Sequence, residues 1–147
     1  MNSRLDFLHA RPEAVKPLMA AEQWIARCGL ERGLLELVRL RASQINGCAY
    51  CVDLHATDAR AAGESERRLA ALTVWREVPF FTARERAALE WTEALTLVTS
   101  THVPDAAWNA VREQFDEAEV VDLSLLIATI NSWNRFAIAF RKPPQAA

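Results

Sequence analysis

Apolar residues recur at steps of three and four along most of the chain, and no segment alternates apolar and polar residues as a half-buried strand would. The clearest stripe is Ala88, Trp91, Leu95 and Val98, which follows the capping-box sequence Thr82-Ala83-Arg84-Glu85. Only four glycines and six prolines interrupt the chain. The pattern predicts an all-α fold, a helical bundle of about seven helices.

The predicted helices are separated by residues that stop or cap a helix, such as Gly29, Gly47, Gly63 and Ser65. They span approximately residues 12–27, 31–46, 48–62, 65–75, 82–98, 104–115 and 117–140. The last segment carries apolar residues on almost every face, so we expect this helix to be central or shared between subunits.

Length and composition suit one globular domain. A chain of 147 residues with 51% hydrophobic residues can bury a core, so we expect a single domain over residues 1–147. Acidic and basic residues are mixed, with a net charge of -2, which argues against a nucleic-acid groove. A polar start and the lack of a long apolar run argue against a leader or a membrane span. We therefore expect a soluble, cytoplasmic protein.

The candidate chemistry gathers around two of the three cysteines. Cys48 and Cys51 are followed by His55, and on a helix spacings of three and four place two thiols and an imidazole along one face. Cys28 is left over and is interpreted as a small buried apolar residue. In a chain with so few cysteines, Cys-x-x-Cys indicates redox chemistry or a metal rather than a disulfide scaffold.

Each member of this group has a plausible chemical role. Cys48 lies in or next to the first turn of the predicted helix 48–62, where the helix dipole lowers the pKa of a thiol. Cys51, one turn later, is close enough to form a disulfide with Cys48. His55 can accept or return a proton near neutral pH, so it is the natural base.

Glu36 is the less obvious candidate, because it interrupts an apolar run between Leu35 and Leu37. If helices 31–46 and 48–62 pack antiparallel about Asn46-Gly47, Glu36 and His55 meet. The alternative is that Glu36 is an ordinary solvated helix residue.

A structural zinc ion is the main alternative for the cysteine pair. Such sites normally need a second pair of soft ligands, and only His55 and Glu36 remain as candidates. We therefore expect a dithiol site with no metal and no cofactor.

The four residues together resemble a known motif. Glu36, Cys48, Cys51 and His55 match Glu-x11-Cys-x2-Cys-x3-His, which marks redox members of the AhpD-like branch of the carboxymuconolactone decarboxylase family. Residues 40–47 and 131–136 are also similar to stretches of short, single-domain members. The resemblance implies an all-α fold in which the Cys-x-x-Cys opens a helix, and assembly into trimers or hexamers.

The same resemblance implies a thiol-dependent peroxidase that reduces hydroperoxides. In that scheme Cys51 attacks the peroxide, Cys48 resolves the product to a disulfide, and Glu36 and His55 relay the proton. The helix-dipole argument alone favours Cys48 as the more acidic thiol, so the assignment of the two cysteines stays open. Some relatives have a histidine where this chain has Tyr50, which implies weaker thiolate activation here.

The resemblance also implies a dithiol reductant, either a dihydrolipoyl-bearing or a thioredoxin-like protein. Two other functions remain open on the sequence. One is a lactone decarboxylase of the same fold, which needs acid–base groups and no thiol pair. The other is a non-enzymatic redox-sensing module in which the disulfide changes assembly.

Overall fold

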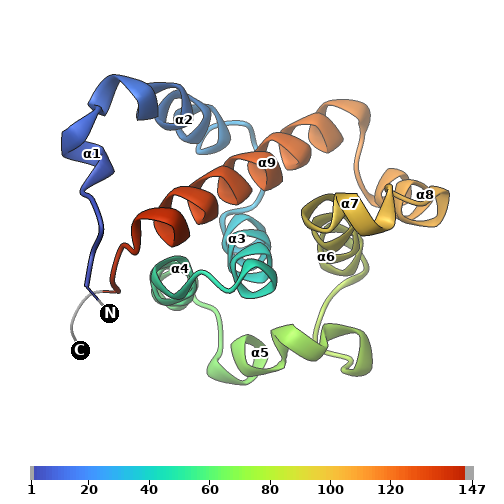
Figure 1. The fold of residues 1–147 in the computed structure, drawn as a ribbon. Helices are drawn as coiled ribbons and strands as arrows, with labels where there is room; N and C mark the ends of the chain where they lie inside the picture. The colour runs from blue at the N-terminus through green and yellow to red at the C-terminus, as the bar shows by residue number, and fades with distance from the viewer. Residues whose placement is uncertain (1, 145–147) are drawn as a thin grey trace.

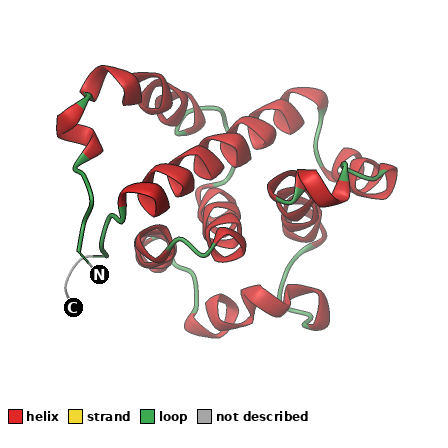
Figure 2. Ribbon diagram, viewed as in Figure 1, coloured by secondary structure: helices red, strands yellow, loops and turns green. Residues whose placement is uncertain are grey.

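The computed structural model describes residues 2–144, and within them the chain is helical without any strand (Figure 2). The elements are α1 (Phe7–Ala10), α2 (Pro12–Ile25), α3 (Arg32–Asn46), α4 (Ala49–Ala61), α5 (Glu66–Ala71), the 3₁₀ helix η1 (Leu72–Glu77), α6 (Ala83–Thr96), α7 (Val98–Thr101), α8 (Asp105–Gln114) and α9 (Glu117–Phe140). The all-α prediction is confirmed. The expected number of about seven helices is too low, because three short helical segments were not anticipated as separate elements.

The first unpredicted helix is α1, which lies in a stretch that the sequence marks only as polar. The Asp6 carboxylate caps it by accepting from the backbone N–H groups of Leu8 and His9. Phe7 is the buried residue of this turn, and its ring packs against those of Phe136 and Phe140 at the end of α9. A single aromatic anchor gives no periodicity, which is why the pattern missed it.

The other two differences are interruptions of predicted helices. The predicted helix 65–75 divides into α5 and η1, and Val74 inside η1 has non-helical dihedral angles (φ -120°, ψ 29°). The predicted helix 82–98 ends at Thr96, and the axis of the short α7 that follows points in a different direction (Figure 1). The predicted caps are confirmed: Ser65 caps α5, and Thr82 with Glu85 forms the capping box of α6.

Helix α9 is the central element, as its apolar composition predicted. It runs across the molecule and packs against α2, α3, α4, α6 and α8 (Figure 1). The buried positions on α9 include Leu123, Leu126, Ile127 and Ile130. Burial of four such side chains is worth roughly 6–12 kcal/mol relative to exposure, so α9 is a main source of the stability of the fold.

The turn between α3 and α4 sets the register of the candidate site. Gly47 ends α3 in the left-handed region (φ 69°), which favours glycine because it has no Cβ. Cys48 then serves as the N-cap of α4, and its backbone N–H donates to the Ser43 carbonyl oxygen at 3.0 Å. Helices α3 and α4 therefore leave the turn antiparallel and pack against each other.

A partly buried network of amide side chains ties this turn to α9. The Asn46 side-chain amide donates to the Oδ1 atoms of Asn131 and Asn134, at 2.9 and 2.8 Å. Asn134 is fully buried and donates in turn to Ser43 Oγ at 3.0 Å. Because the buried Ser43 and Asn134 and the half-buried Asn46 and Asn131 satisfy one another, they fix α9 at one position beside the turn.

None of the helices in residues 2–144 combines the length and the apolar character that a membrane span requires. The single-domain assignment over residues 1–147 stays a prediction, and residues 1 and 145–147 lie outside the described residues.

We expect Asn134→Ala to lower the free energy of unfolding by about 2 kcal/mol, because it removes the hydrogen bonds of Asn134 with the half-buried Asn46 and the buried Ser43 and leaves a space beside α9. Urea unfolding of the reduced protein measures this loss. Asn109→Ala, on the exposed side of α8, is the matched control and should change stability by less than about 0.5 kcal/mol. Equal effects of the two substitutions would show that the network does not hold α9.

Candidate functional site

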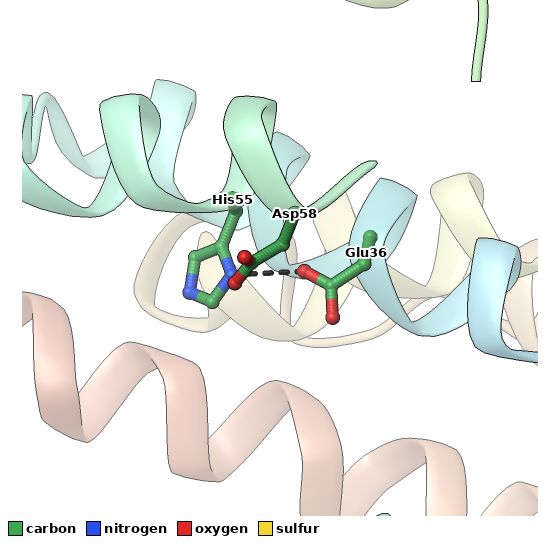
Figure 3. A group of neighbouring side chains, drawn as sticks. All are labelled: Glu36, His55 and Asp58. Atoms are coloured by element: carbon green, nitrogen blue, oxygen red, sulfur yellow. Dashed lines mark hydrogen bonds and ion pairs between the residues drawn. The ribbon is translucent and has the colours of Figure 1, made fainter. Parts of the chain in front are cut away.

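The antiparallel packing of α3 and α4 brings Glu36 and His55 together. His55 Nδ1 and Glu36 Oε2 lie 3.0 Å apart, and Figure 3 shows the imidazole of α4 facing the carboxylate of α3. Glu36 is only 7% exposed, so it is not the solvated residue that the sequence left as an alternative. The predicted proximity of these two residues is confirmed.

A second basic group completes the surroundings of Glu36. Arg39, one turn later on α3, donates to Glu36 Oε1 at 2.6 Å and to Glu22 Oε2 on α2 at 2.6 Å. Trp133 on α9 donates from its indole N–H to Glu22 Oε1 at 3.2 Å. The chain His55–Glu36–Arg39–Glu22–Trp133 therefore links four helices through side-chain contacts.

These contacts decide the charge of Glu36. Burial by itself raises the pKa of a carboxyl group, but the hydrogen bond with His55 and the charges of Arg39 and His55 outweigh it, so the pKa of Glu36 lies below its ordinary value. Glu36 is thus a carboxylate at neutral pH. Since a carboxylate only accepts, the Nδ1 atom of a neutral His55 carries the proton, and Nε2, on the far side of the ring, is left as the acceptor.

Cys48 and Cys51 are joined as a disulfide with a Cα–Cα distance of 5.3 Å. Cys48 occupies the N-cap position of α4, as predicted, and the Cys51 backbone N–H donates to its Sγ at 3.3 Å. Both residues are buried, at 1% and 3% exposure, and they pack against Ala137 of α9. Cys28 has no part in this group: it is half-buried, and its thiol donates to the Ile25 carbonyl oxygen.

A cavity of about 360 Å³ joins the disulfide to the histidine. Cys51, Leu54, His55 and Asp58 line one wall, so Cys51 and His55 share a space that a small molecule can occupy. The apolar part of the lining comes from four helices and includes Phe7, Leu8, Met19, Leu54, Ile130 and Trp133. Such a mostly apolar cavity with a few convergent polar groups is typical of a small-molecule site.

Asp58 is a site residue that sequence reasoning missed. It lies one turn after His55 on α4. One potential metal-ligating atom from each of Glu36, His55 and Asp58 lies within 4.8 Å of the other two (Figure 3). Its spacing of three from His55 was the available signal. The trio has the residue types of a metal site, but both Glu36 oxygens already have basic partners, and the Arg39 guanidinium repels a cation.

The predicted residues are thus brought together, with one difference in how they face. Glu36 reaches the site through His55, whereas Cys51 and His55 line the cavity directly. Cys48 does not line this cavity and borders a second one.

The comparisons with known proteins agree with this architecture. The model of the carboxymuconolactone decarboxylase family matches residues 12–94, a stretch that contains Glu36, both cysteines of the disulfide and His55. The chain belongs to the carboxymuconolactone decarboxylase family.

Two relatives cover nearly the whole chain. The protein YdfG of Bacillus subtilis (strain 168), itself uncharacterized, is 44% identical over 139 residues and covers 95% of both chains. A protein of unknown function from Agrobacterium tumefaciens, named as a candidate AhpD antioxidant defence protein, has a crystal structure with a TM-score of 0.96 at 41% identity, covering 99% of this chain and 100% of its own. The fold is therefore that of the AhpD-like members of the family.

A third structure shows how far this fold extends. A peroxidase-related protein with an alkylhydroperoxidase AhpD core, from Ralstonia eutropha JMP134, has a TM-score of 0.81 at 24% identity and covers 94% of this chain and 74% of its own.

Helix α9 lies beyond the stretch that the family model matches, yet Trp133 and Ala137 on it border the cavity. The family motif alone therefore does not define the whole site.

The charge of Glu36 makes the free energy of unfolding depend on pH. Because its pKa in the folded protein is below its ordinary value of 4.5, the carboxylate stabilises the fold fully above that pH, and the contribution is lost as pH falls through the lower, folded value. We expect the free energy of unfolding of the wild type to fall more steeply below pH 4.5 than that of Glu36→Gln. Urea titrations at a series of pH values measure both slopes.

Glu77→Gln, at an exposed position of η1, is the matched control and should follow the wild-type slope. If Glu36→Gln also follows it, the carboxylate is not held charged by His55 and Arg39.

Proposed function

We propose that this protein is a thiol-dependent peroxidase that reduces hydroperoxides through a dithiol–disulfide cycle of Cys48 and Cys51. The observation that carries the proposal is that Cys51 and His55 line one cavity, while a buried carboxylate holds His55 with its free ring nitrogen as a base. A thiol, a base and a space for a substrate are what this reaction needs.

The oxidative step begins on the reduced protein. His55 Nε2 takes the proton of the Cys51 thiol, and the thiolate attacks the terminal oxygen of the hydroperoxide. An S–O bond forms and the O–O bond breaks, so that Cys51 becomes a sulfenic acid. The leaving alkoxide takes the proton back from His55 and departs as an alcohol. Glu36 stabilises the imidazolium in between, in the way a buried carboxylate supports a catalytic histidine.

The resolving step uses the neighbouring sulfur. The Cys48 sulfur attacks the sulfenic sulfur of Cys51, the new S–S bond forms, and hydroxide leaves as water with the proton of the Cys48 thiol. The hydroperoxide is thereby reduced to an alcohol and water, and the two thiols are oxidised to the disulfide. The 5.3 Å between the Cα atoms of the two cysteines suits this bond.

The cavity supports Cys51 as the thiol that attacks the peroxide. The N-cap position and the Cys51 backbone N–H favour a thiolate on Cys48, as the helix-dipole argument stated. An attacking thiol, however, also needs access to the substrate and a base nearby, and the cavity that Cys51 shares with His55 supports both. The N-cap environment then suits Cys48 as the sulfur that resolves and later leaves.

The apolar lining supports an organic hydroperoxide as the substrate, since it stabilises an alkyl group beside the reacting sulfur.

Tyr50 stands at the position where some relatives have histidine. The Lys142 ammonium lies over its ring, 4.6 Å from the ring centroid. The dithiol reductant, a homo-oligomeric state and a cytoplasmic location stay predictions. Exposed apolar residues on α9, such as Val121 at 67% exposure, support association between copies of the chain.

We expect the reduced protein to lose two hydrogens in intact mass after treatment with one equivalent of tert-butyl hydroperoxide, because the cycle ends in the disulfide. Peptide mapping should find Cys48 joined to Cys51. Cys28→Ser is the matched control and should behave like the wild type, whereas Cys51→Ser should consume no peroxide. A mass that oxidant leaves unchanged would exclude this function. Enzymatic activity that the Cys48→Ser, Cys51→Ser double variant retains would not need the thiols and would favour the decarboxylase alternative.

A further inference from the structure

The two cysteines of the disulfide line two different cavities. Cys51 lines the cavity that contains His55, whereas Cys48 lines a second cavity of about 340 Å³ beside the end of α9. Tyr50, Ala137 and Lys142 border both spaces and therefore form, with the disulfide itself, the partition between them. The residues that line only the second cavity include Gly47, Ala49, Ile138, Arg141 and Pro144.

This arrangement restricts how a reductant reaches the disulfide. At 1% and 3% exposure, neither sulfur is open to a thiol in bulk water, so the reductant must enter one of the two cavities. In thiol–disulfide exchange the attacking sulfur approaches in line with the bond that breaks, from the side of the sulfur that is attacked. Approach through the second cavity therefore leads to Cys48, and approach through the first leads to Cys51.

We propose that the dithiol reductant reaches the disulfide through the cavity beside Cys48, so that peroxide and reductant act on opposite sides of one disulfide. The inference rests on the proposed function and adds to it the sulfur that the reductant attacks. The occupant is the thiolate arm of a dithiol donor: Arg141 and Lys142 line this cavity with no acidic residue, whereas Glu22 and Asp58 line the first. The first cavity then stays free for the hydroperoxide.

The exchange transfers two electrons from the donor to the disulfide. A donor thiolate attacks Cys48 Sγ, a donor–Cys48 S–S bond forms, and the Cys48–Cys51 bond breaks with its electron pair on Cys51. The leaving Cys51 sulfur takes up the proton that the attacking donor thiol released, and His55 Nε2, in the cavity of Cys51, relays it. The second donor thiol attacks the donor sulfur of the mixed disulfide and releases Cys48, whose charge the Cys51 backbone N–H stabilises. The donor dithiol is oxidised to its disulfide, and the protein regains both thiols.

A matched pair of substitutions separates the two access routes. Ile138 lines only the cavity of Cys48, and Met19 lines only the cavity of Cys51; both are about half exposed, at 45%. We expect Ile138→Trp to slow reduction of the disulfide by dihydrolipoamide roughly tenfold while oxidation of the reduced protein by tert-butyl hydroperoxide changes less than about twofold. Met19→Trp should slow the oxidation and leave the reduction unchanged. Stopped-flow tryptophan fluorescence and quenched mass analysis follow the two half-reactions separately.

The outcome that would overturn the proposal is Met19→Trp slowing both half-reactions while Ile138→Trp slows neither, because reductant and peroxide would then share the first cavity. Failure of the proposed function is distinguishable from this. If hydroperoxide does not oxidise the thiols, the disulfide can be formed with diamide, and the effect of Ile138→Trp on its reduction still tests the route beside Cys48.

A trapping experiment gives an independent readout that does not depend on either tryptophan. In a Cys28→Ser background, Cys51→Ser keeps only Cys48, and Cys48→Ser keeps only Cys51. We expect 2-hydroxyethyl disulfide to form a mixed disulfide faster with the variant that keeps Cys48, as judged by the mass gain. Faster trapping of the variant that keeps Cys51 would contradict the proposal.

Discussion

The contact between His55 and Glu36 is the interaction on which the site depends. A carboxylate in the middle of an apolar helix is costly to bury, and here the cost is offset by His55 on one oxygen and Arg39 on the other. The same contact fixes the imidazole with Nε2 free, beside the cavity that Cys51 shares. One buried charge thereby fixes the ring orientation and, in the proposed mechanism, the nitrogen that accepts a proton.

The rest of the fold serves to hold this contact in register. Gly47 ends α3 in a left-handed turn, so that α4 returns antiparallel and Glu36 faces His55 across the two helices. The hydrogen bond between Asn46 and the buried Asn134 attaches the turn to α9, and Ala137 on α9 packs against the disulfide. Because Trp133 of α9 also lines the cavity, the position of α9 affects both the environment of the disulfide and the shape of the cavity.

The sequence predicted most of this, for identifiable reasons. Helical periodicity and capping residues gave the long helices, since α9 and the capping box of α6 follow local rules. The meeting of Glu36 with His55 was predictable because a short turn leaves little choice of register. Other features depend on tertiary contacts. The anchor of α1 is one aromatic residue, Phe7, which packs on α9, far away in the sequence. That Cys48 and Cys51 line different cavities depends on where α9 ends. The position of Asp58 beside His55 could have been predicted from its spacing of three on the helix, but its proximity to Glu36 could not.

In the proposed mechanism the Glu36–His55 pair activates Cys51. The most direct measurement is the second-order rate constant for disulfide formation by tert-butyl hydroperoxide as a function of pH, in the wild type, Glu36→Gln and the control Glu77→Gln. We expect Glu36→Gln to react about tenfold or more slowly near neutral pH, the gap to narrow at alkaline pH where the thiol ionises unaided, and Glu77→Gln to match the wild type. A folded Glu36→Gln protein that reacts at the wild-type rate at every pH would contradict this mechanism, because Glu36 would then only support the packing of α3.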